Sequence, residues 1–287
     1  MAAAKAVVFA YHDVGVRCLG ALLEAGVEVP RVVTHRDDPN ENLWFASVAG
    51  LARDRGIDVL VADFPFTEKF IGEIRHLRPD FIFSFYYRHL LPMPLLALAK
   101  RGAYNMHGSL LPRYRGRAPV NWAVIRGETE TGATLHEMVE KPDAGRIVDQ
   151  QAVPIGPDEL AVEVFRKVTD AAETVLRRSM EHLLSGQVKL KPQDLSQGSY
   201  FGGRRPEDGR IDWSRSAAEI HNLVRGVAPP YPGAFCDLDG RTLRILRTRR
   251  EDGTASGKTK GPYREGGDWF AACGDGKVLR LLETRLT

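Results

Sequence analysis

The sequence contains few cysteines, and their spacing argues against two classes of protein. Only three cysteines occur in 287 residues, Cys18, Cys236 and Cys273, and no two of them form a Cys-x-x-Cys pair. An odd number of widely separated cysteines supports neither a disulfide framework nor a cysteine-ligated zinc site. The cysteine pattern therefore predicts a cytoplasmic protein, kept reduced, with no cysteine metal centre.

The sequence also lacks a long hydrophobic run and a strong excess of one charge. The apolar run Ala6–Tyr11 is too short for a signal peptide, and prolines interrupt the run Leu90–Ala99. The formal net charge of +3 does not by itself indicate a nucleic-acid partner. With 43% apolar and 27% charged residues, the composition is typical of a globular protein with a full core. We expect neither a membrane nor a nucleic-acid partner.

Neither common glycine-rich nucleotide motif is present. The first apolar run is followed by Tyr-His-Asp-Val-Gly at residues 11–15 and not by Gly-x-Gly-x-x-Gly, and the chain contains no Walker-type loop. This absence disfavours nicotinamide and P-loop chemistry. We therefore expect no NAD cofactor. Because the sequence also has neither a Cys-x-x-Cys pair nor His-x-x-x-His spacing, we expect no metal ion either.

What the first part of the chain does contain is an alternation of short apolar segments with helical patterns. Segments rich in Val, Ile, Phe and Tyr predict strands at residues 6–10, 31–35, 58–62, 81–86 and 103–107. Helical patterns lie between them at residues 18–25, 45–55, 68–77 and 95–100. This alternation predicts an α/β domain with a doubly wound, mostly parallel, Rossmann-like sheet. Such sheets bind ligands beyond the carboxyl ends of their strands.

The middle of the chain predicts two extended segments and a long helix. Residues 133–139 and 146–155 read as antiparallel partners around the turn Lys-Pro-Asp-Ala-Gly. The helix begins near Pro157, has acidic residues in its first turn, and stops before Gly186.

The C-terminal part predicts a second, smaller domain. After a polar linker, strand-like segments with turn signals at Asp239-Gly240 and Asp275-Gly276 suggest a small OB-like β-barrel. We expect residues 253–267 to form a mobile loop. The predicted division is a catalytic domain over residues 1–188, a linker over residues 189–205 and an OB-like domain over residues 206–287.

The stretch from Asn105 to Pro119 carries the clearest candidates for chemistry. Asn105 and His107 stand two residues apart at the end of a predicted strand, so both side chains point to the same face. Gly108 allows a ligand to approach the backbone closely. Asp143 lies in the Pro-Asp-Ala-Gly turn; such an aspartate often only shapes the turn, unless the segment after it pairs beside the Asn105 strand.

An amide, an imidazole and a carboxylate together suit the attack of an amine on a one-carbon acyl donor. His107 would take a proton from the amine and return one to the leaving nitrogen, Asn105 would stabilise the oxyanion, and a carboxylate at Asp143 would favour the imidazolium. No side-chain nucleophile is required. Ser109 lacks the Gly-x-Ser-x-Gly surroundings of an acyl-enzyme serine.

These residues carry a family resemblance. Asn105-x-His107-x-Ser109-Leu-Leu-Pro, Tyr114-Arg-Gly and Asp143-x-Gly145 resemble the signature of the 10-formyltetrahydrofolate-dependent formyltransferases. The C-terminal block from Val224 to Ala234 is similar to the second domain of methionyl-tRNA formyltransferases. Residues 7–13, 83–90, 116–122 and 127–132 resemble the formyltransferase half of the bifunctional enzyme that modifies UDP-4-amino-4-deoxy-L-arabinose.

The resemblance implies a function and a set of site residues. It implies transfer of a formyl group from 10-formyltetrahydrofolate to the amine of UDP-4-amino-4-deoxy-L-arabinose, a step of lipid A modification in polymyxin resistance. It implies small-molecule partners only, a folate and a nucleotide sugar. The catalytic positions would be Asn105, His107 and Asp143, and the diphosphate positions Arg204 and Arg205. The positions that line the folate pocket would be His89, Leu90, Leu91, Arg117, Val139, Glu140, Lys141, Pro142 and Asp143.

Several alternatives remain open from the sequence. The bifunctional relative continues into an NAD-dependent decarboxylase, so this chain represents an excised half, a stand-alone enzyme, or a relative acting on another nucleotide-linked aminosugar. A methionyl-tRNA formyltransferase would need a basic second domain, but residues 206–287 hold 14 Lys and Arg against 12 Asp and Glu, a net charge of +2. A non-enzymatic binding module would leave the catalytic trio without a purpose. A metallohydrolase using His89, His107 and His136 lacks the His-x-x-x-His spacing.

Overall fold

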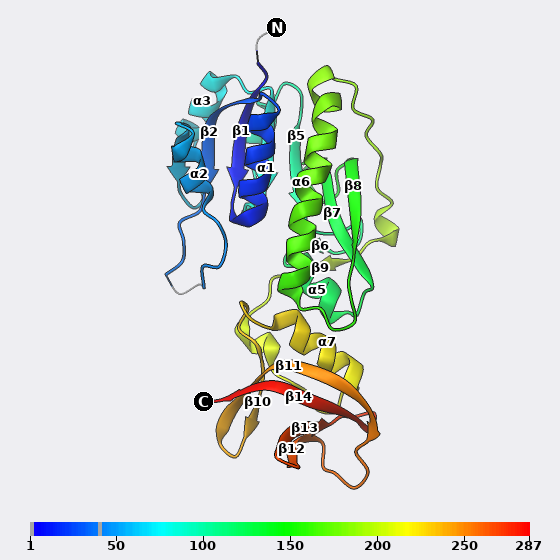
Figure 1. Cartoon of the computed structure of the whole chain (residues 1–287). Helices are drawn as coiled ribbons and strands as arrows, with labels where there is room; N and C mark the ends of the chain where they lie inside the picture. The colour runs from blue at the N-terminus through cyan, green and yellow to red at the C-terminus, as the bar shows by residue number, and fades with distance from the viewer. Residues whose placement is uncertain (1–2, 40–41) are drawn as a thin grey trace. The chain divides into compact units, whose positions relative to one another are not determined.

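A computed structural model describes residues 3–39 and 42–287, which form two compact units (Figure 1). The first unit contains the chain up to Gly116, Gly132–Val153 and Lys167–Tyr200. The second contains Arg117–Thr131, Pro154–Arg166 and Phe201–Thr287. The division at residues 188 and 206 that the sequence suggests stays a prediction.

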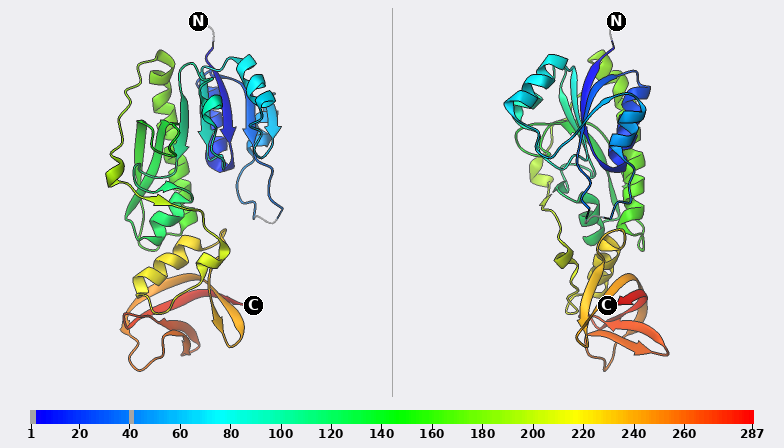
Figure 2. Two further views of the ribbon diagram at one scale, coloured as in Figure 1. Left: turned by 180° about the vertical axis from the view of Figure 1, so that it is seen from behind. Right: turned by 90° about the vertical axis from the view of Figure 1, so that its left-hand side faces the viewer.

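The first unit is built on a seven-stranded sheet in the order β3-β2-β1-β4-β5-β7-β8. Its strands are β1 (Lys5–Ala10), β2 (Glu28–Thr34), β3 (Asp58–Val61), β4 (Phe81–Phe85), β5 (Ala103–His107), β7 (Glu130–Glu137) and β8 (Ile147–Pro154). Its helices are α1 (His12–Glu24), α2 (Val48–Asp54), α3 (Glu68–Leu77) and α4 (Met93–Leu96), and it holds most of α6 (Ala161–Ser185). Figure 2 shows helices on both faces of this sheet.

The central strands are parallel because both of their faces are covered. The four phenylalanine and isoleucine side chains Phe81, Ile82, Phe83 and Phe85 of β4 are fully buried, which is typical of strands packed between two helical layers. β1 pairs in parallel with β2 and β4, and β4 pairs in parallel with β5. The expected Rossmann-like architecture is confirmed.

The order of the strands answers the question that the sequence left open about Asp143. The segment that pairs beside β5 is the earlier one, β7, and it runs antiparallel, with Asn105 opposite His136. β8 lies outside β7. Since β7 ends opposite Tyr104, near the start of β5, the following residues turn back and bring Asp143 to the side chains of β5. The turn therefore reaches His107 by folding back rather than by continuing a strand.

The second unit contains a curled, five-stranded antiparallel sheet in the order β10-β11-β14-β13-β12 (Figure 1). The strands are β10 (Ala234–Leu238), β11 (Arg241–Thr254), β12 (Gly261–Glu265), β13 (Asp268–Ala272) and β14 (Lys277–Leu286). Helix α7 (Ala217–Val227) packs on it, with Ile220 and Val224 buried against Ile245 and Leu279. This agrees with the expected OB-like domain. The mobile loop expected at residues 253–267 is wrong in part, because β12 lies within it and pairs with β13.

Short elements complete the chain. They are β6 (Arg115–Gly116), α5 (Pro119–Ile125), η1 (Leu195–Gln197), β9 (Tyr200–Phe201) and η2 (Pro206–Gly209). In the second unit, α5 packs against α7, and the Asn121 side chain donates a hydrogen bond to the Gly226 carbonyl oxygen at 2.9 Å. The segment that follows the catalytic motif in sequence is therefore part of the C-terminal unit.

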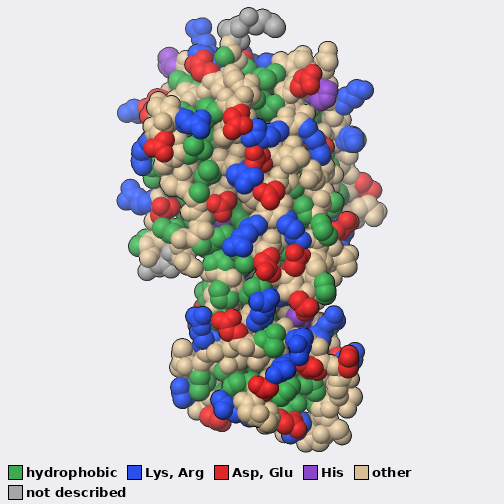
Figure 3. Space-filling view, viewed as in Figure 1, with side chains coloured by type: hydrophobic (Ala, Val, Ile, Leu, Met, Phe, Trp, Pro, Cys, Tyr) green, Lys and Arg blue, Asp and Glu red, His purple; other side chains and the backbone are tan. Residues whose placement is uncertain are grey.

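The described residues include no helix long and apolar enough to span a bilayer. Figure 3 shows basic and acidic side chains interspersed over the visible face of each unit, with no large area of one sign. This distribution agrees with the small net charge of the sequence.

Candidate active site

The candidate site lies in the first unit, on the side chains of β5 and of the segments around it. His107 is buried, with 6% of its surface exposed, and Asn105 is half-buried. The Nδ1 atom of His107 lies 3.7 Å from Oδ1 of Asp143. His136 contacts both Asn105 and Asp143. Its Nε2 atom is 3.1 Å from Asn105 Nδ2 and 3.6 Å from Asp143 Oδ1. The three residues expected from sequence are therefore brought together, and a fourth joins them.

The hydrogen bonding of His107 determines which nitrogen can accept a proton. Nε2 is 2.8 Å from the carbonyl oxygen of Tyr114. A carbonyl can only accept, so Nε2 carries a hydrogen and donates it. In the neutral ring the lone pair is then on Nδ1, the nitrogen that faces Asp143. The separation of 3.7 Å is too long for a hydrogen bond, so the two groups interact by charge.

The loop after β5 is held in a conformation that presents the Tyr114 carbonyl. Tyr114 has a positive φ of 57°, which is uncommon for a bulky residue. The Ser109 hydroxyl donates to the Arg113 carbonyl at 2.6 Å, and the Tyr114 N–H donates to the Ser199 hydroxyl at 2.8 Å. The Thr134 hydroxyl donates to the Ser109 carbonyl at 2.6 Å. Ser109 therefore stabilises the loop through its hydrogen bonds, in agreement with its lack of an acyl-enzyme motif.

Asp143 is oriented by its own backbone and by two neighbours. Its φ is 53°, in the left-handed region, and its Oδ2 accepts a hydrogen bond from the Gly116 N–H at 2.8 Å. A Cβ atom at Gly145 would lie 2.0 Å from the Glu137 carbonyl oxygen, so the turn can close only with glycine there. Burial works to raise the pKa of the Asp143 carboxyl, but the charge of His107, the Gly116 N–H and the charge of Arg115 outweigh it and hold that pKa below its usual value.

His136 is the functional candidate that the sequence did not single out for this site. Its ring is 1% exposed, and its Nδ1 atom lies 2.8 Å from the Glu137 carbonyl oxygen, to which it must donate. Burial lowers the pKa of His136 to about 4, so the ring is neutral at physiological pH. The Thr-Leu-His pattern places this ring on the same face as Thr134, but only the register with β5 shows that it meets Asn105.

Arg115 is a second residue that sequence analysis left unassigned. It is 9% exposed, and its buried Nε atom has no hydrogen-bond partner in the described part of the chain. No ion pair or side-chain hydrogen bond of its guanidinium occurs among residues 3–39 and 42–287. A buried cation without a direct partner is costly, and its charge acts on the carboxylate of Asp143.

Apart from Arg117, the residues expected to line a folate pocket belong to two segments of the first unit. His89, Leu90 and Leu91 follow β4, and residues 139–142 precede Asp143. Leu90 is 73% exposed and Val139 42% exposed. Phe64, 67% exposed, packs its ring on that of His89 with 3.6 Å between the ring centroids. Large exposed apolar side chains therefore occur in the loops that follow β3, β4 and β7.

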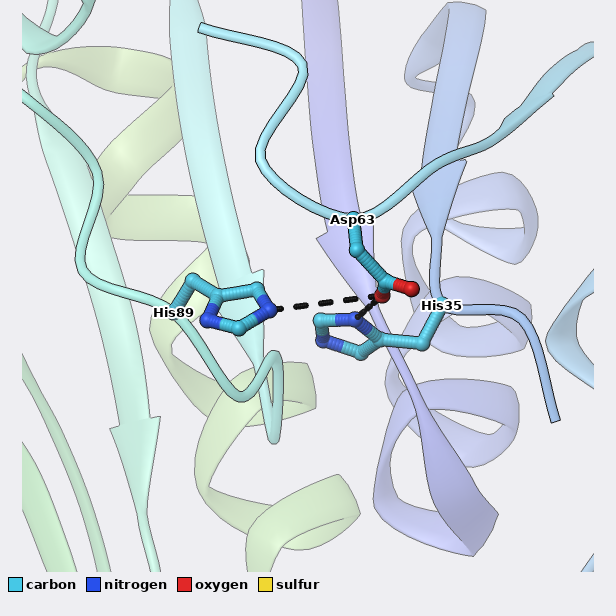
Figure 4. Close-up of side chains that lie close together, drawn as sticks. All are labelled: His35, Asp63 and His89. Carbon is cyan, nitrogen blue, oxygen red and sulfur yellow. Dashed lines mark hydrogen bonds and ion pairs between the residues drawn. The ribbon is translucent and has the colours of Figure 1, made fainter. Parts of the chain in front are cut away.

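His35, Asp63 and His89 form a cluster beside these residues with the side-chain types of a metal site (Figure 4). His35 Nδ1 lies 2.9 Å and His89 Nε2 4.0 Å from Oδ1 of Asp63. The Arg88 N–H donates to His35 Nε2 at 2.8 Å, so Nε2 has no proton and Nδ1 donates to Asp63. A histidine ligand normally keeps a proton on its other nitrogen, where the Arg88 N–H would oppose it. The donor set therefore fits a hydrogen-bond network and does not fit a metal ion.

The histidines considered for a metallohydrolase do not form one group. In the described part of the chain, His89 belongs with His35 and Asp63, whereas the His107 and His136 rings lie 6.4 Å apart between centroids, beside Asp143. Burial lowers the pKa of His35 and keeps it neutral. His35 therefore anchors the segment that carries Arg88 and His89.

The three remaining arginines of the predicted site lie in the second unit. Arg204 stacks its guanidinium over the Trp122 ring at 4.6 Å from the centroid and donates to the Asp208 carbonyl at 2.9 Å, and the Trp122 ring also stacks with the Phe201 ring at 5.0 Å between centroids. Arg117 donates its backbone N–H to the Phe201 carbonyl at 3.0 Å, and its exposed side chain lies near Gly203. Arg205 is exposed. Arg204 is therefore the most rigidly held of the three.

Solved structures with the same fold were found along nearly the whole chain. An N-formyltransferase from Helicobacter canadensis, in complex with folinic acid and dTDP-3-aminofucose, has a TM-score of 0.77 at 18% identity, over 98% of this chain and 99% of that one. WlaRD, a sugar 3N-formyltransferase with dTDP and 5-N-formyl-THF, has a TM-score of 0.76 at 17% identity, over 98% of each chain. A sugar N-formyltransferase from a Shewanella species has a TM-score of 0.68 at 18% identity, over 85% of this chain and 96% of that one. At these identities the likeness establishes the fold.

Family models identify the chain more directly. The model described as formyl transferase matches residues 25–180, which is more than half of the chain and includes Asn105, His107 and Asp143. The model described as formyl transferase, C-terminal domain, matches residues 204–287. The expectation of an enzyme that transfers a formyl group is confirmed: the chain belongs to the formyl transferase family.

Proposed function

We propose that the chain transfers a formyl group from 10-formyltetrahydrofolate to the amine of a nucleotide-linked aminosugar, with UDP-4-amino-4-deoxy-L-arabinose as the first candidate. The observation that carries the proposal is the group formed by Asn105, His107, Asp143 and His136, in which contacts fix the tautomers of both histidine rings and orient the amide and the carboxylate. Residues 116–122 and 127–132, which resemble the arabinose enzyme, support the choice of sugar.

The chemistry begins with the attack of the amine nitrogen on the formyl carbon. A C–N bond forms, the carbonyl π electrons move to oxygen, and the nitrogen must lose a proton. His107 Nδ1 accepts that proton, because Nε2 is already protonated and bound to Tyr114. The imidazolium that results faces the carboxylate of Asp143 at 3.7 Å. A carboxylate whose pKa is held low stays ionised and stabilises this cation.

The second half of the reaction breaks the bond between the formyl carbon and the donor nitrogen. The oxyanion electrons re-form the carbonyl, the donor nitrogen leaves with the bonding pair, and His107 returns a proton to it. Asn105 supplies an N–H to the oxyanion while it exists. Charge, protons and atoms balance, with a formamide and tetrahydrofolate as products and no side-chain nucleophile involved.

The folate donor has support from the chain and from its relatives. The H. canadensis enzyme holds folinic acid, WlaRD holds 5-N-formyl-THF and HypX from Aquifex aeolicus has been solved with tetrahydrofolic acid. In this chain, Leu90, Phe64 and Val139 expose apolar surface that suits a flat heteroaromatic ring. Residues 139–142 and the segment His89–Leu91 would hold the pteridine of the folate and direct the formyl group on its N10 atom toward His107.

The nucleotide part of the acceptor is assigned to arginines of the second unit. We assign the diphosphate to Arg204, with Arg205 beside it. The Arg204 guanidinium stacks on Trp122 and donates one N–H to the Asp208 carbonyl at 2.9 Å, which holds it in place, and its other N–H groups would donate to phosphate oxygens. Burial lowers the pKa of Arg204 without neutralising it at physiological pH. Two of the solved relatives hold dTDP or a dTDP-linked sugar. The experiment must therefore compare uracil and thymine nucleotides.

The test is a turnover panel with 10-formyltetrahydrofolate as donor. The acceptors are UDP-4-amino-4-deoxy-L-arabinose, dTDP-linked 3-amino and 4-amino sugars, and methionyl-tRNA, with formylation followed by mass spectrometry. We expect the UDP-arabinose amine to have the highest kcat/KM. A dTDP sugar as the best acceptor would retain the reaction and change the substrate, whereas efficient formylation of tRNA with all sugars inert would refute the proposal.

A further inference from the structure

The inference concerns the orientation of the Asn105 amide and rests on the proposed function. An asparagine side chain presents NH₂ at one end and a carbonyl oxygen at the other, with opposite hydrogen-bonding roles. Only the NH₂ end can stabilise an oxyanion. The site therefore needs a group that distinguishes the two ends of Asn105.

His136 is placed to make this distinction. Its Nδ1 lies 2.8 Å from the Glu137 carbonyl oxygen, which obliges Nδ1 to carry the proton. Nε2 then has only a lone pair, and it lies 3.1 Å from Asn105 Nδ2. A flipped amide would direct the oxygen of Asn105 at that lone pair, and two acceptors at this distance repel each other. Only the orientation with Nδ2 toward the ring forms a hydrogen bond.

The surroundings of His136 keep it in this state. The ring is 1% exposed and sits on β7, directly opposite Asn105 across the strand pair. The groups that face it are Asp143, 3.6 Å from Nε2, and His107, whose ring is 6.4 Å away between centroids. Burial keeps the pKa of His136 at about 4, so the ring does not gain a second proton near neutral pH.

We propose that His136 is a positioning residue for formyl transfer: its unprotonated Nε2 accepts one N–H of Asn105 and thereby holds the amide with its second N–H free for the oxyanion. His136 touches neither the amine nor the formyl group in this role. It acts through Asn105, so its effect should disappear when Asn105 is removed.

The first test is a double-mutant cycle. His136→Met keeps a similar volume without an acceptor for Asn105, and His136→Gln restores a carbonyl acceptor. We expect His136→Met to lower kcat about 10- to 100-fold, the range for one lost hydrogen bond in a buried site, with KM for both substrates unchanged. His136→Gln should recover a large part of the loss. In an Asn105→Ala background, His136→Met should have no further effect.

A control variant at another buried histidine separates positioning from packing. His221 is also buried and hydrogen-bonded, to the Thr248 hydroxyl at 2.8 Å in the second unit, so His221→Met should leave kcat within about twofold while lowering stability comparably. Equal losses of kcat for His136→Met with and without Asn105 would overturn the proposal, because His136 would then act independently of that residue.

A measurement on the unmodified chain tests the proposal even if the His136 variants do not fold. It also tests the proposal if the acceptor panel yields no substrate. Nitrogen NMR shifts of the His136 ring should report a protonated Nδ1 and an unprotonated Nε2 at neutral pH. A protonated Nε2 would refute the positioning role whatever the acceptor is. Failure of every sugar acceptor together with the expected tautomer would refute the proposed function and leave the geometry of His136 and Asn105 intact.

Discussion

The two ring nitrogens of His107 face different partners: Nε2 lies 2.8 Å from the Tyr114 carbonyl oxygen, and Nδ1 lies 3.7 Å from Oδ1 of Asp143. The first contact fixes the tautomer, and the second places a carboxylate where the imidazolium charge appears. The gap of 3.7 Å leaves the Nδ1 lone pair without a hydrogen bond to Asp143, so it can accept a proton from an incoming amine.

Removing any member of the trio should abolish most of the activity without unfolding the chain. We expect His107→Ala, Asn105→Ala and Asp143→Ala each to lower kcat by about two to four orders of magnitude, the range for a general acid–base or oxyanion group. Steady-state kinetics with circular dichroism as a fold control would measure this. Near-normal kcat in His107→Ala would contradict the assigned mechanism.

Replacing Arg115 should change the pH dependence of turnover. The charge of Arg115 helps to hold the pKa of Asp143 below its usual value, so Arg115→Met should raise that pKa. Asp143 must be ionised to stabilise the imidazolium. On acidification, kcat should therefore begin to fall at a higher pH in the variant than in the parent chain.

A matched control for Arg115 is available nearby. Arg146 is an exposed arginine paired with Glu137 at 2.6 Å, and Arg146→Met should leave the acid limb of the pH–rate profile in place. An unchanged limb in Arg115→Met, or an equal shift in both variants, would show that the Arg115 charge does not act on Asp143 in particular.

Gly145 should tolerate no side chain. A Cβ there would lie 2.0 Å from the Glu137 carbonyl oxygen, so Gly145→Ala must displace the turn that carries Asp143. We expect a loss of kcat together with a loss of stability of about 1–3 kcal/mol. Gly72→Ala in α3 meets nothing within 4 Å and should leave both quantities unchanged or raise stability slightly. Equal thermal midpoints and equal kcat for the two variants would contradict the close approach.

Leu90 should contribute to donor binding and not to the chemical step. It is 73% exposed in the segment assigned to folate, and burial of a leucine side chain against a ligand contributes about 1.5–3 kcal/mol. Leu90→Ser should raise KM for 10-formyltetrahydrofolate about 10-fold with little change in kcat. Leu282, 47% exposed on β14 of the second unit, gives the control, and Leu282→Ser should leave that KM unchanged. A lowered kcat at saturating folate would contradict this prediction, because Leu90 would then affect the chemical step.

Local patterns in the sequence predicted the alternation of strands and helices in the first unit and half of the site, although α1 begins at His12 and not at residue 18. The apolar segments of β1, β4 and β5 predict a buried parallel sheet because strands covered on both faces need no polar residues. The two-residue spacing of Asn105 and His107 places their side chains on one face wherever the strand lies. The family resemblance of the Asp-x-Gly turn identified Asp143 as the third residue of the predicted site. Each of these conclusions depends only on residues close together in the chain.

The tertiary structure alone decided how these residues meet. Pairing of β7 with β5 sets His136 opposite Asn105, and no spacing in the sequence encodes that register. The tautomer of His107 depends on a backbone carbonyl, that of Tyr114, which a sequence cannot orient. The buried state of Arg115 arises only when the loop after β5 packs on Ser199. These relationships join segments distant in the chain, so their physical basis is the packing of the whole first unit.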